Sequence, residues 1–221
     1  PGPRQLTPQV NSTLARRELE YTLDKRKYTY QFKVTLQGIQ PPVWRRIQVP
    51  ATYTFWGLHV AIQDSMGWLD YHLHAFRFPV RRGDPAVEIG IPDDEPYAHQ
   101  HPCLPGWEIA ITDLLRDPGV SVSYEYDFGD GWEHEVLFEG CLKAENGGRY
   151  PLCVEGERNC PPEDVGGVWG YAEFLEAIGD PKHEEHERML EWAGKFDPEE
   201  FDAGETTKLM RRGLPDQRQH R

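Results

Sequence analysis

Long hydrophobic runs are missing from this chain, and positive charge is scarce in its middle. No apolar stretch approaches the ~20 residues that a membrane-spanning helix needs, and no secretory pattern of basic, apolar and small residues is present. Residues 84–135 contain thirteen acidic residues and one basic residue, Arg116. Such a segment repels phosphate backbones, so nucleic acid is not expected as a partner. We expect a cytoplasmic protein without a membrane segment. Its acidic segment is either a solvated surface that aids solubility, which is the simpler interpretation, or a surface that holds a cation or meets a basic protein partner.

Cysteine is also scarce, with 4 residues in a chain of 221. In a cytosolic chain such cysteines are more often thiols or metal ligands than disulfides. Cys153 and Cys160 have six residues between them, whereas structural zinc sites use pairs with about two to four. A buried thiol pair is therefore the simpler interpretation, and a metal site is the alternative. Phosphate-binding glycine loops, nucleophile elbows and dinucleotide-binding fingerprints are absent as well, so no reaction follows from a recognised catalytic motif.

Aromatic residues, glycine and proline are plentiful. Aromatics make up 12% of the chain, which indicates a globular fold, while 21 glycines and 19 prolines indicate many short elements joined by turns. Apolar and polar residues alternate in two stretches, which predicts an antiparallel strand pair over residues 28–36 and 43–49. A helix is predicted over residues 55–66, where apolar residues recur at spacings of four between the N-cap residue Thr54 and the stop residue Gly67.

The order of the elements predicts the fold class. Strands dominate the first two thirds of the chain, and two helices are predicted late, over residues 171–178 and 181–192. This order is typical of an α+β fold, here a single domain in which helices pack on a mostly antiparallel sheet. The domain is expected to cover residues 28–202, between an N-terminal arm at 1–27 and a polar, basic tail at 203–221.

The most informative stretch runs from Tyr124 to His134 and is typical of a β-hairpin. Asp130-Gly131 favours a two-residue turn, because glycine accepts a positive φ without steric cost. Such a turn places Asp127 directly opposite His134, with Cβ atoms about 4.5–5.5 Å apart on one face. This pair would orient the imidazole for metal binding or proton transfer, or it would be a cross-strand polar pair with no further role.

Two more histidines extend this candidate site. His72 and His74 lie two residues apart in a predicted strand, so both imidazoles share one face about 6.5–7 Å apart, which suits two ligands of one metal ion. With Asp127 and His134 they would bind a divalent metal such as Zn²⁺, Mn²⁺ or Fe²⁺ as a cofactor. Asp130 would then act as a base toward metal-bound water. The alternative is that the histidines lie on a half-buried polar face while the aspartates make turn hydrogen bonds.

Three motifs occur in order along the chain: Pro-Pro-Val-Trp-Arg-Arg at residues 41–46, Tyr-Asp-Phe-Gly-Asp-Gly-Trp-Glu-His at 126–134, and Pro-Pro-Glu-Asp-Val-Gly-Gly at 161–167. In this order and spacing they resemble the Ri-plasmid open-reading-frame-three family, which is found on plasmids and as passenger genes of insertion elements. The resemblance covers about residues 28–202 and implies a compact α+β domain. The family often has a cysteine where this chain has Val165, and this departure argues against a cysteine metal site.

The motifs contain further candidate site residues. Glu163 and Asp164 precede two glycines, and a carboxylate held in such a loop would coordinate a cation or cap the helix that follows. Capping or bracing of the loop is the simpler interpretation, because Gly-Gly permits positive φ. Trp132 also belongs to a motif, although a tryptophan in a strand is typical of a core anchor.

Three functions remain as hypotheses. The first is a binding or accessory domain linked to mobile elements that acts through protein contacts, because the chain combines an acidic segment with many aromatic residues. The second is a metal-dependent hydrolase that uses the His72, His74, Asp127 and His134 site. The third is an accessory role in DNA recombination, which rests on the genomic setting of the family and on the basic residues of the arm and tail.

Overall fold

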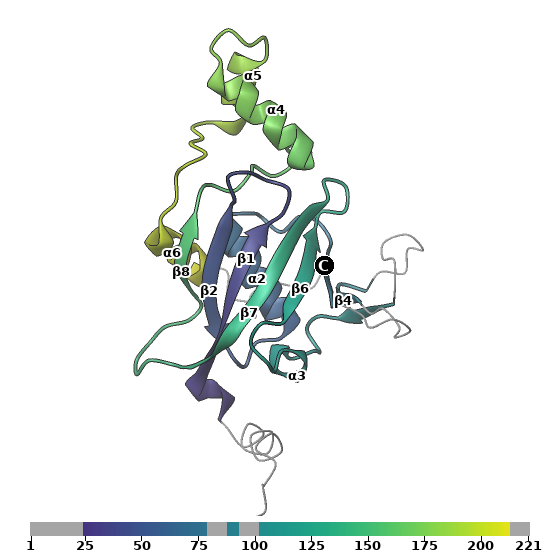
Figure 1. The fold of residues 1–221 in the computed structure, drawn as a ribbon, viewed down its shortest axis with the longest axis vertical. Coiled ribbons are helices and arrows are strands. Elements are labelled where there is room, and N and C mark those ends of the chain that lie inside the picture. Colours follow the sequence, from purple (N-terminus) through teal and green to yellow (C-terminus); the bar gives the residue numbers. More distant parts are fainter. Residues whose placement is uncertain (1–23, 79–87, 93–101, 213–221) are drawn as a thin grey trace, which may run out of the picture.

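Eight strands pair into one sheet in the computed structural model, which describes residues 24–78, 88–92 and 102–212 (Figure 1). The strand order is β5-β4-β3-β6-β7-β1-β2-β8. The pairing of β4 with β5 is parallel, whereas the other neighbours are antiparallel. Together with the helices, this mostly antiparallel sheet confirms the predicted α+β class. Most of the predicted N-terminal arm and the end of the predicted tail lie outside the described residues.

The strands are β1 (Tyr28–Leu36), β2 (Trp44–Pro50), β3 (His74–Arg77), β4 (Glu88–Gly90), β5 (Cys103–Pro105), β6 (Ser121–Tyr126), β7 (Trp132–Lys143) and β8 (Leu152–Glu157). The helices are the 3-10 helix η1 (Lys25–Lys27) and the α-helices α2 (Phe55–Met66), α3 (Ile111–Leu114), α4 (Gly167–Gly179), α5 (His186–Ala193) and α6 (Ala203–Arg212). In the described parts of the chain, no helix has the length and apolar character that crossing a membrane requires.

One face of the sheet is buried and packs against α2. Along β1, β6 and β7 alternate side chains are buried, which is the pattern of a sheet covered on one side. The predicted helix over residues 55–66 is confirmed as α2. The Thr54 hydroxyl accepts a hydrogen bond from the Gly57 N–H at 3.4 Å, and Gly67 ends the helix with a φ of 84°. All residues of α2 are buried, so this helix forms the centre of the core.

The hairpin between β6 and β7 differs from the predicted two-residue turn. Tyr126 pairs with Trp132, so the loop comprises all of residues 127–131. Asp127 adopts a φ of 55°, and its Oδ1 accepts hydrogen bonds from the backbone N–H groups of the residues at 129 and 130, at 3.0 and 3.3 Å. These bonds close a longer loop than Asp130-Gly131 alone would form. His134 pairs with Tyr124, so the predicted pair of Asp127 with His134 is wrong.

Gly131 still requires a left-handed backbone, with a φ of 67°. We expect Gly131→Val to lower the free energy of unfolding by about 1–2 kcal/mol, because a β-branched side chain is strained there. No heavy atom lies within 4 Å of a Cβ built at this position, so the cost is conformational. Gly131→Asn is the matched control, because asparagine tolerates this region. Urea unfolding of both variants measures the effect, and a valine variant as stable as the asparagine variant would contradict it.

The C-terminal region is more helical than predicted. The late helix predicted from residue 181 begins only at His186, because Asp180 Oδ1 accepts a hydrogen bond from Lys182 N–H at 2.9 Å and forms a turn instead. Residues 203–212, predicted as part of a polar tail, form α6, in which Thr206 and Met210 are buried. These two residues lie four apart and so share one helix face. Ala203 and Met210 are the apolar side chains of this face, and two such residues gave little hydrophobic pattern to detect.

Helix α6 also covers the edge strand β8. The Thr207 hydroxyl oxygen accepts a hydrogen bond from the Cys153 N–H at 2.9 Å and lies 3.2 Å from the Cys153 carbonyl oxygen, to which it donates. Both backbone polar groups of one residue of the edge strand are thereby satisfied by one side chain.

Helices α4 and α5 form a lobe that projects from one end of the sheet (Figure 1). The Phe174 ring of α4 lies 6.0 Å from the Trp192 ring of α5 and 5.2 Å from the Phe196 ring, measured between centroids. The lobe therefore has an aromatic cluster of its own. Its connection to the sheet runs through residues 158–166, which contain the third sequence motif except its last glycine.

Candidate functional site

Three segments that are distant in sequence meet at the end of the sheet near this lobe. They are the connection between α2 and β3, the β6–β7 loop, and the loop before α4. Glu163, from the loop before α4, bonds to the α2–β3 connection and to the end of β6: its Oε2 accepts a hydrogen bond from Leu69 N–H at 2.8 Å, and its Oε1 accepts one from the hydroxyl of Tyr126, the last residue of β6, at 2.5 Å. Asp130 Oδ2 in turn accepts the Gly166 N–H at 3.0 Å. The second and third motifs of the sequence are thus fastened together.

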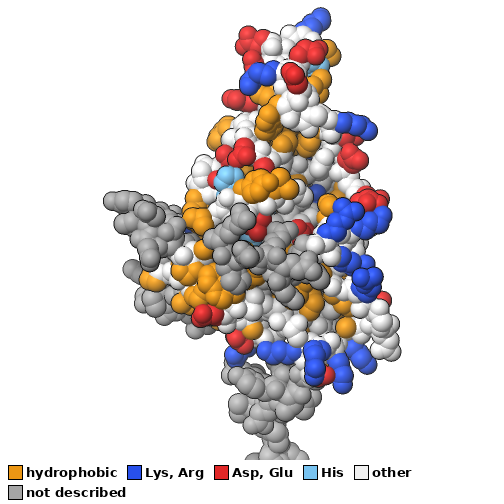
Figure 2. Space-filling model, turned by 180° about the vertical axis from the view of Figure 1, so that it is seen from behind, with side chains coloured by type: hydrophobic (Ala, Val, Ile, Leu, Met, Phe, Trp, Pro, Cys, Tyr) orange, Lys and Arg blue, Asp and Glu red, His pale blue; other side chains and the backbone are white. Residues whose placement is uncertain are grey.

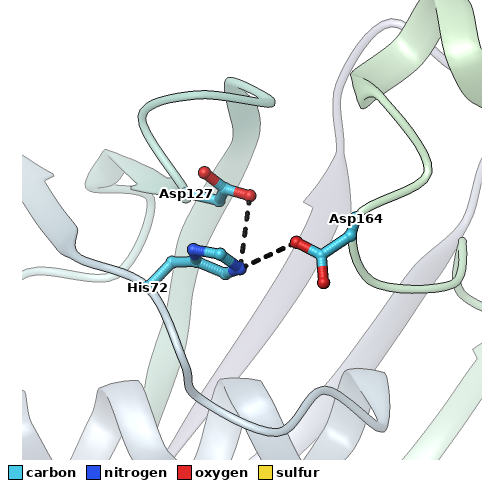
Figure 3. A group of neighbouring side chains, drawn as sticks. All are labelled: His72, Asp127 and Asp164. Carbon is cyan, nitrogen blue, oxygen red and sulfur yellow. Dashed lines mark hydrogen bonds and ion pairs between the residues drawn. The ribbon is translucent and has the colours of Figure 1, made fainter.

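His72, Asp127 and Asp164 form a compact group at this junction (Figure 3). His72 Nε2 lies 3.0 Å from Asp164 Oδ1 and 3.6 Å from Asp127 Oδ2. Among the residues that the structure describes, this is the one group of three histidine, cysteine or carboxylate ligand atoms that lie within 4.8 Å of one another. Ligand atoms that share a Zn²⁺ ion at about 2.0–2.2 Å lie about 3–4 Å apart, and the two distances from His72 Nε2 fall in this range.

The two aspartates are held by their backbones. Asp127 and Asp164 both have positive φ values, 55° and 58°, a conformation that costs free energy in residues other than glycine. Because Asp127 Oδ1 already accepts two backbone N–H groups, its Oδ2 is the oxygen that faces His72 (Figure 3). Fixing one oxygen of a carboxylate and leaving the other available is how outer hydrogen bonds orient metal ligands.

A family model described as "Plasmid pRiA4b ORF-3-like protein" matches residues 28–205. The chain belongs to the plasmid pRiA4b ORF-3-like family. It is 41% identical over 168 residues to "Uncharacterized protein y4hQ" of Sinorhizobium fredii (strain NBRC 101917 / NGR234), which covers 76% of this chain and 81% of that protein. Its fold is similar to the crystal structure of the protein of unknown function MM3350 from Methanosarcina mazei Go1, with a TM-score of 0.71 and 41% identity over 80% of this chain and 97% of that one. The family predicted from the three motifs is confirmed.

In this pRiA4b ORF-3-like protein the four predicted ligands do not meet. His72 and Asp127 lie together, whereas His74 and His134 are buried in the core. The His74 ring stacks on the His59 ring with centroids 3.5 Å apart and an interplanar angle of 8°. β3 begins only at His74, so His72 lies in irregular backbone, to which the period of two does not apply. The third member of the group is Asp164, from a loop that sequence periodicity does not connect to His72.

The other predicted site residues serve the architecture of the pRiA4b ORF-3-like domain. Asp130 and Glu163 connect the loops, and the Gly166 N–H donates to Oδ2 of Asp130, the residue that was predicted to act as a base. Trp132 is 1% exposed and belongs to the core. Cys153 and Cys160 are both buried, and burial raises the pKa of their thiols to about 11 and about 12. Neutral thiols are poor metal ligands.

Sequence reasoning missed a buried polar network behind the site. His59 Nδ1 lies 2.8 Å from the Tyr124 hydroxyl and its Nε2 lies 2.8 Å from Asp70 Oδ1, while Gln63 Nε2 donates to the same hydroxyl at 2.9 Å. Burial raises the pKa of Tyr124 well above its usual value, so the hydroxyl stays protonated. Asp70 is two residues from His72, and the network therefore anchors the segment that positions it. The signal was present, since His59 and Gln63 lie four apart on one face of a mostly apolar helix.

His134 makes the stability of the protein depend on pH. Burial lowers the pKa of this histidine from 6.5 to about 4. The unfolded chain therefore binds a proton at a pH where the folded protein does not, and stability falls as the pH is lowered from about 6.5 to about 4. The expected loss reaches about 3 kcal/mol. Urea unfolding across this range measures it. His134→Phe should show a flatter profile than the parent, and an equally steep one would contradict the assignment.

Proposed function

We propose that the protein binds a divalent metal ion through His72 Nε2, Asp127 Oδ2 and Asp164 Oδ1. The observation on which this rests is the convergence of these three ligand atoms, from three separate segments, within 4.8 Å of one another. One imidazole and two carboxylates suit Zn²⁺, Mn²⁺ or Fe²⁺. The side chains of His72 and Asp164 are 32% and 66% exposed, so an ion from solution can reach them.

The distribution of charge supports a cation at this position. The stretches 47–76, 117–142 and 159–181, which include the three converging segments, contain two, seven and five acidic residues and not one lysine or arginine. Clefts and surfaces with one sign of charge raise the local concentration of the opposite ion. The alternative is that His72 and the two aspartates only bond to one another and hold no ion, and the metal content of the protein distinguishes these cases.

Elemental analysis of protein purified without added metal, followed by calorimetric titration of Zn²⁺ and Mn²⁺ into protein treated with a chelator, tests the proposal. We expect one ion per chain, and an affinity at least about 100-fold lower in His72→Ala, since changes even to the outer partners of metal ligands cost about 10–100-fold. His183→Ala in the lobe is the matched control and should bind as the parent does. Substoichiometric metal, or equal affinity in the parent and His72→Ala, would rule out the site.

Hydrolysis is a second candidate function, favoured by the number of ligands. Three protein ligands leave coordination positions for water and substrate, as in catalytic rather than structural zinc sites. An ester and phosphodiester substrate panel, assayed with and without Mn²⁺, tests it. Activity that survives in His72→Ala would come from a contaminant or another site and would argue against this function. The roles in protein contact and in DNA recombination stay predictions. The scarcity of positive charge around the site does not support a role in DNA recombination.

A further inference from the structure

The three most exposed large hydrophobic side chains of the described residues all lie within five residues in sequence of a member of the group formed by His72, Asp127 and Asp164. Trp169 is 84% exposed, Tyr71 73% and Leu69 62%, and the next most exposed is at 49%. Leu69 and Tyr71 precede His72 in the same segment, and Trp169 lies in the first turn of α4, five residues after Asp164. Figure 2 shows hydrophobic side chains next to acidic side chains and a histidine, below the projecting lobe.

We propose that Leu69, Tyr71 and Trp169 form a docking surface for a basic, arginine-bearing segment of a partner protein. None of the three is a metal ligand, so this proposal goes beyond metal binding and can fail separately from it. Soluble proteins rarely expose contiguous apolar patches to water, and such patches mark interaction sites. A guanidinium is both charged and flat. Two aromatic rings at the edge of an acidic surface suit such a cation, because the carboxylates attract its charge and the rings stack on its plane.

Charge selects the partner. The segments that hold these three side chains contain no lysine or arginine between residues 47 and 76 or between residues 159 and 181. Nearby carboxylates would accept hydrogen bonds from a guanidinium, which binds them in a two-pronged geometry, while the rings stack on its plane. A phosphate-bearing ligand is repelled by the same field. A second copy of this chain is disfavoured, because each copy has a formal net charge of −13.

The basic turn at residues 25–27, within the described part of the chain, lies away from this surface. Lys25–Lys27 form η1, which lies at the end of the sheet opposite the α4–α5 lobe (Figure 1). This turn therefore does not cover the surface, and the proposed occupant is a segment of another protein that combines positive charge with apolar contacts.

Binding of a fluorescently labelled oligo-arginine peptide tests the proposal, with oligo-lysine and oligo-glutamate for comparison. All titrations are made in chelator, so that loss of the metal site does not affect the result. We expect oligo-arginine to bind most tightly and Trp169→Ala to weaken it roughly five-fold, the size of a surface cation–π contact. Trp169→Phe should retain part of the affinity.

Leu209→Ala is the matched control, because this side chain is 43% exposed on α6, away from the docking surface. Equal affinity in Trp169→Ala and Leu209→Ala would show that the peptide is held by net charge alone and would overturn the proposal. The proposal would also be overturned if sedimentation showed a dimer that Trp169→Ala dissociates, since the surface would then join two copies of the chain.

Discussion

Gly167→Ala is expected to lower the free energy of unfolding by about 2–4 kcal/mol. Gly167 has a φ of 67°, and a Cβ built on it would lie 2.3 Å from the Asp130 carbonyl oxygen. The backbone of the hairpin loop occupies the space of the missing side chain, so alanine must push the β6–β7 loop away from the loop before α4. Because Asp127 and Asp164 belong to these two loops, metal affinity should fall together with stability.

Urea unfolding and Zn²⁺ titration of the same variant measure both effects. Gly179→Ala is the control, since it lies at the other end of α4 and no heavy atom stands within 4 Å of its Cβ position. An alanine at 167 that leaves stability and affinity unchanged would mean that the two loops do not touch as described.

His59→Leu is expected to lower the free energy of unfolding by a similar amount, about 2–4 kcal/mol. The ring is fully buried, stacks on His74, and bonds both Asp70 and the Tyr124 hydroxyl. Leucine fills much of the volume of the imidazole ring, but Asp70 Oδ1 and the Tyr124 hydroxyl lose their bonds to that ring. The loss of the Asp70 bond should also loosen the segment that positions His72, so that metal affinity falls although no ligand has been changed.

A double-mutant cycle with Tyr124→Phe isolates the network from general packing effects. The two residues share one hydrogen bond, so the double variant should lose less stability than the sum of the single variants. Additive losses, measured by urea unfolding, would show that His59 and Tyr124 do not act through that bond.

Elements fixed by local contacts were predictable from the sequence. The helix over residues 55–66 has its own cap at Thr54 and its own stop at Gly67, and both act on backbone atoms close in sequence. The strand pair of β1 and β2 follows from alternation and an adjacent turn, and it was predicted within one residue. The family itself was recognisable, because three motifs in a fixed order specify more than any one of them.

The candidate site was only partly predictable, because it depends on side-chain bonds between distant segments. Asp127 Oδ1 binds two N–H groups of its own loop, and this lengthens the turn and shifts the register of β7. The shift moves His134 from the site to the core. Asp164 reaches His72 only because Glu163 and Asp130 fasten its loop to the hairpin. The motif residues were identified, but their meeting point depends on tertiary contacts that spacing does not reveal.

The pairing of Thr207 with Cys153 has a consequence for how the protein behaves when it is shortened. The family match stops at residue 205, within α6 and before the residues that cover β8. A fragment cut at that boundary would keep every family motif and lose the cover of an edge strand. Open edges recruit strands from other molecules. The unit that covers its own edge strand is therefore longer than the unit that sequence comparison recognises.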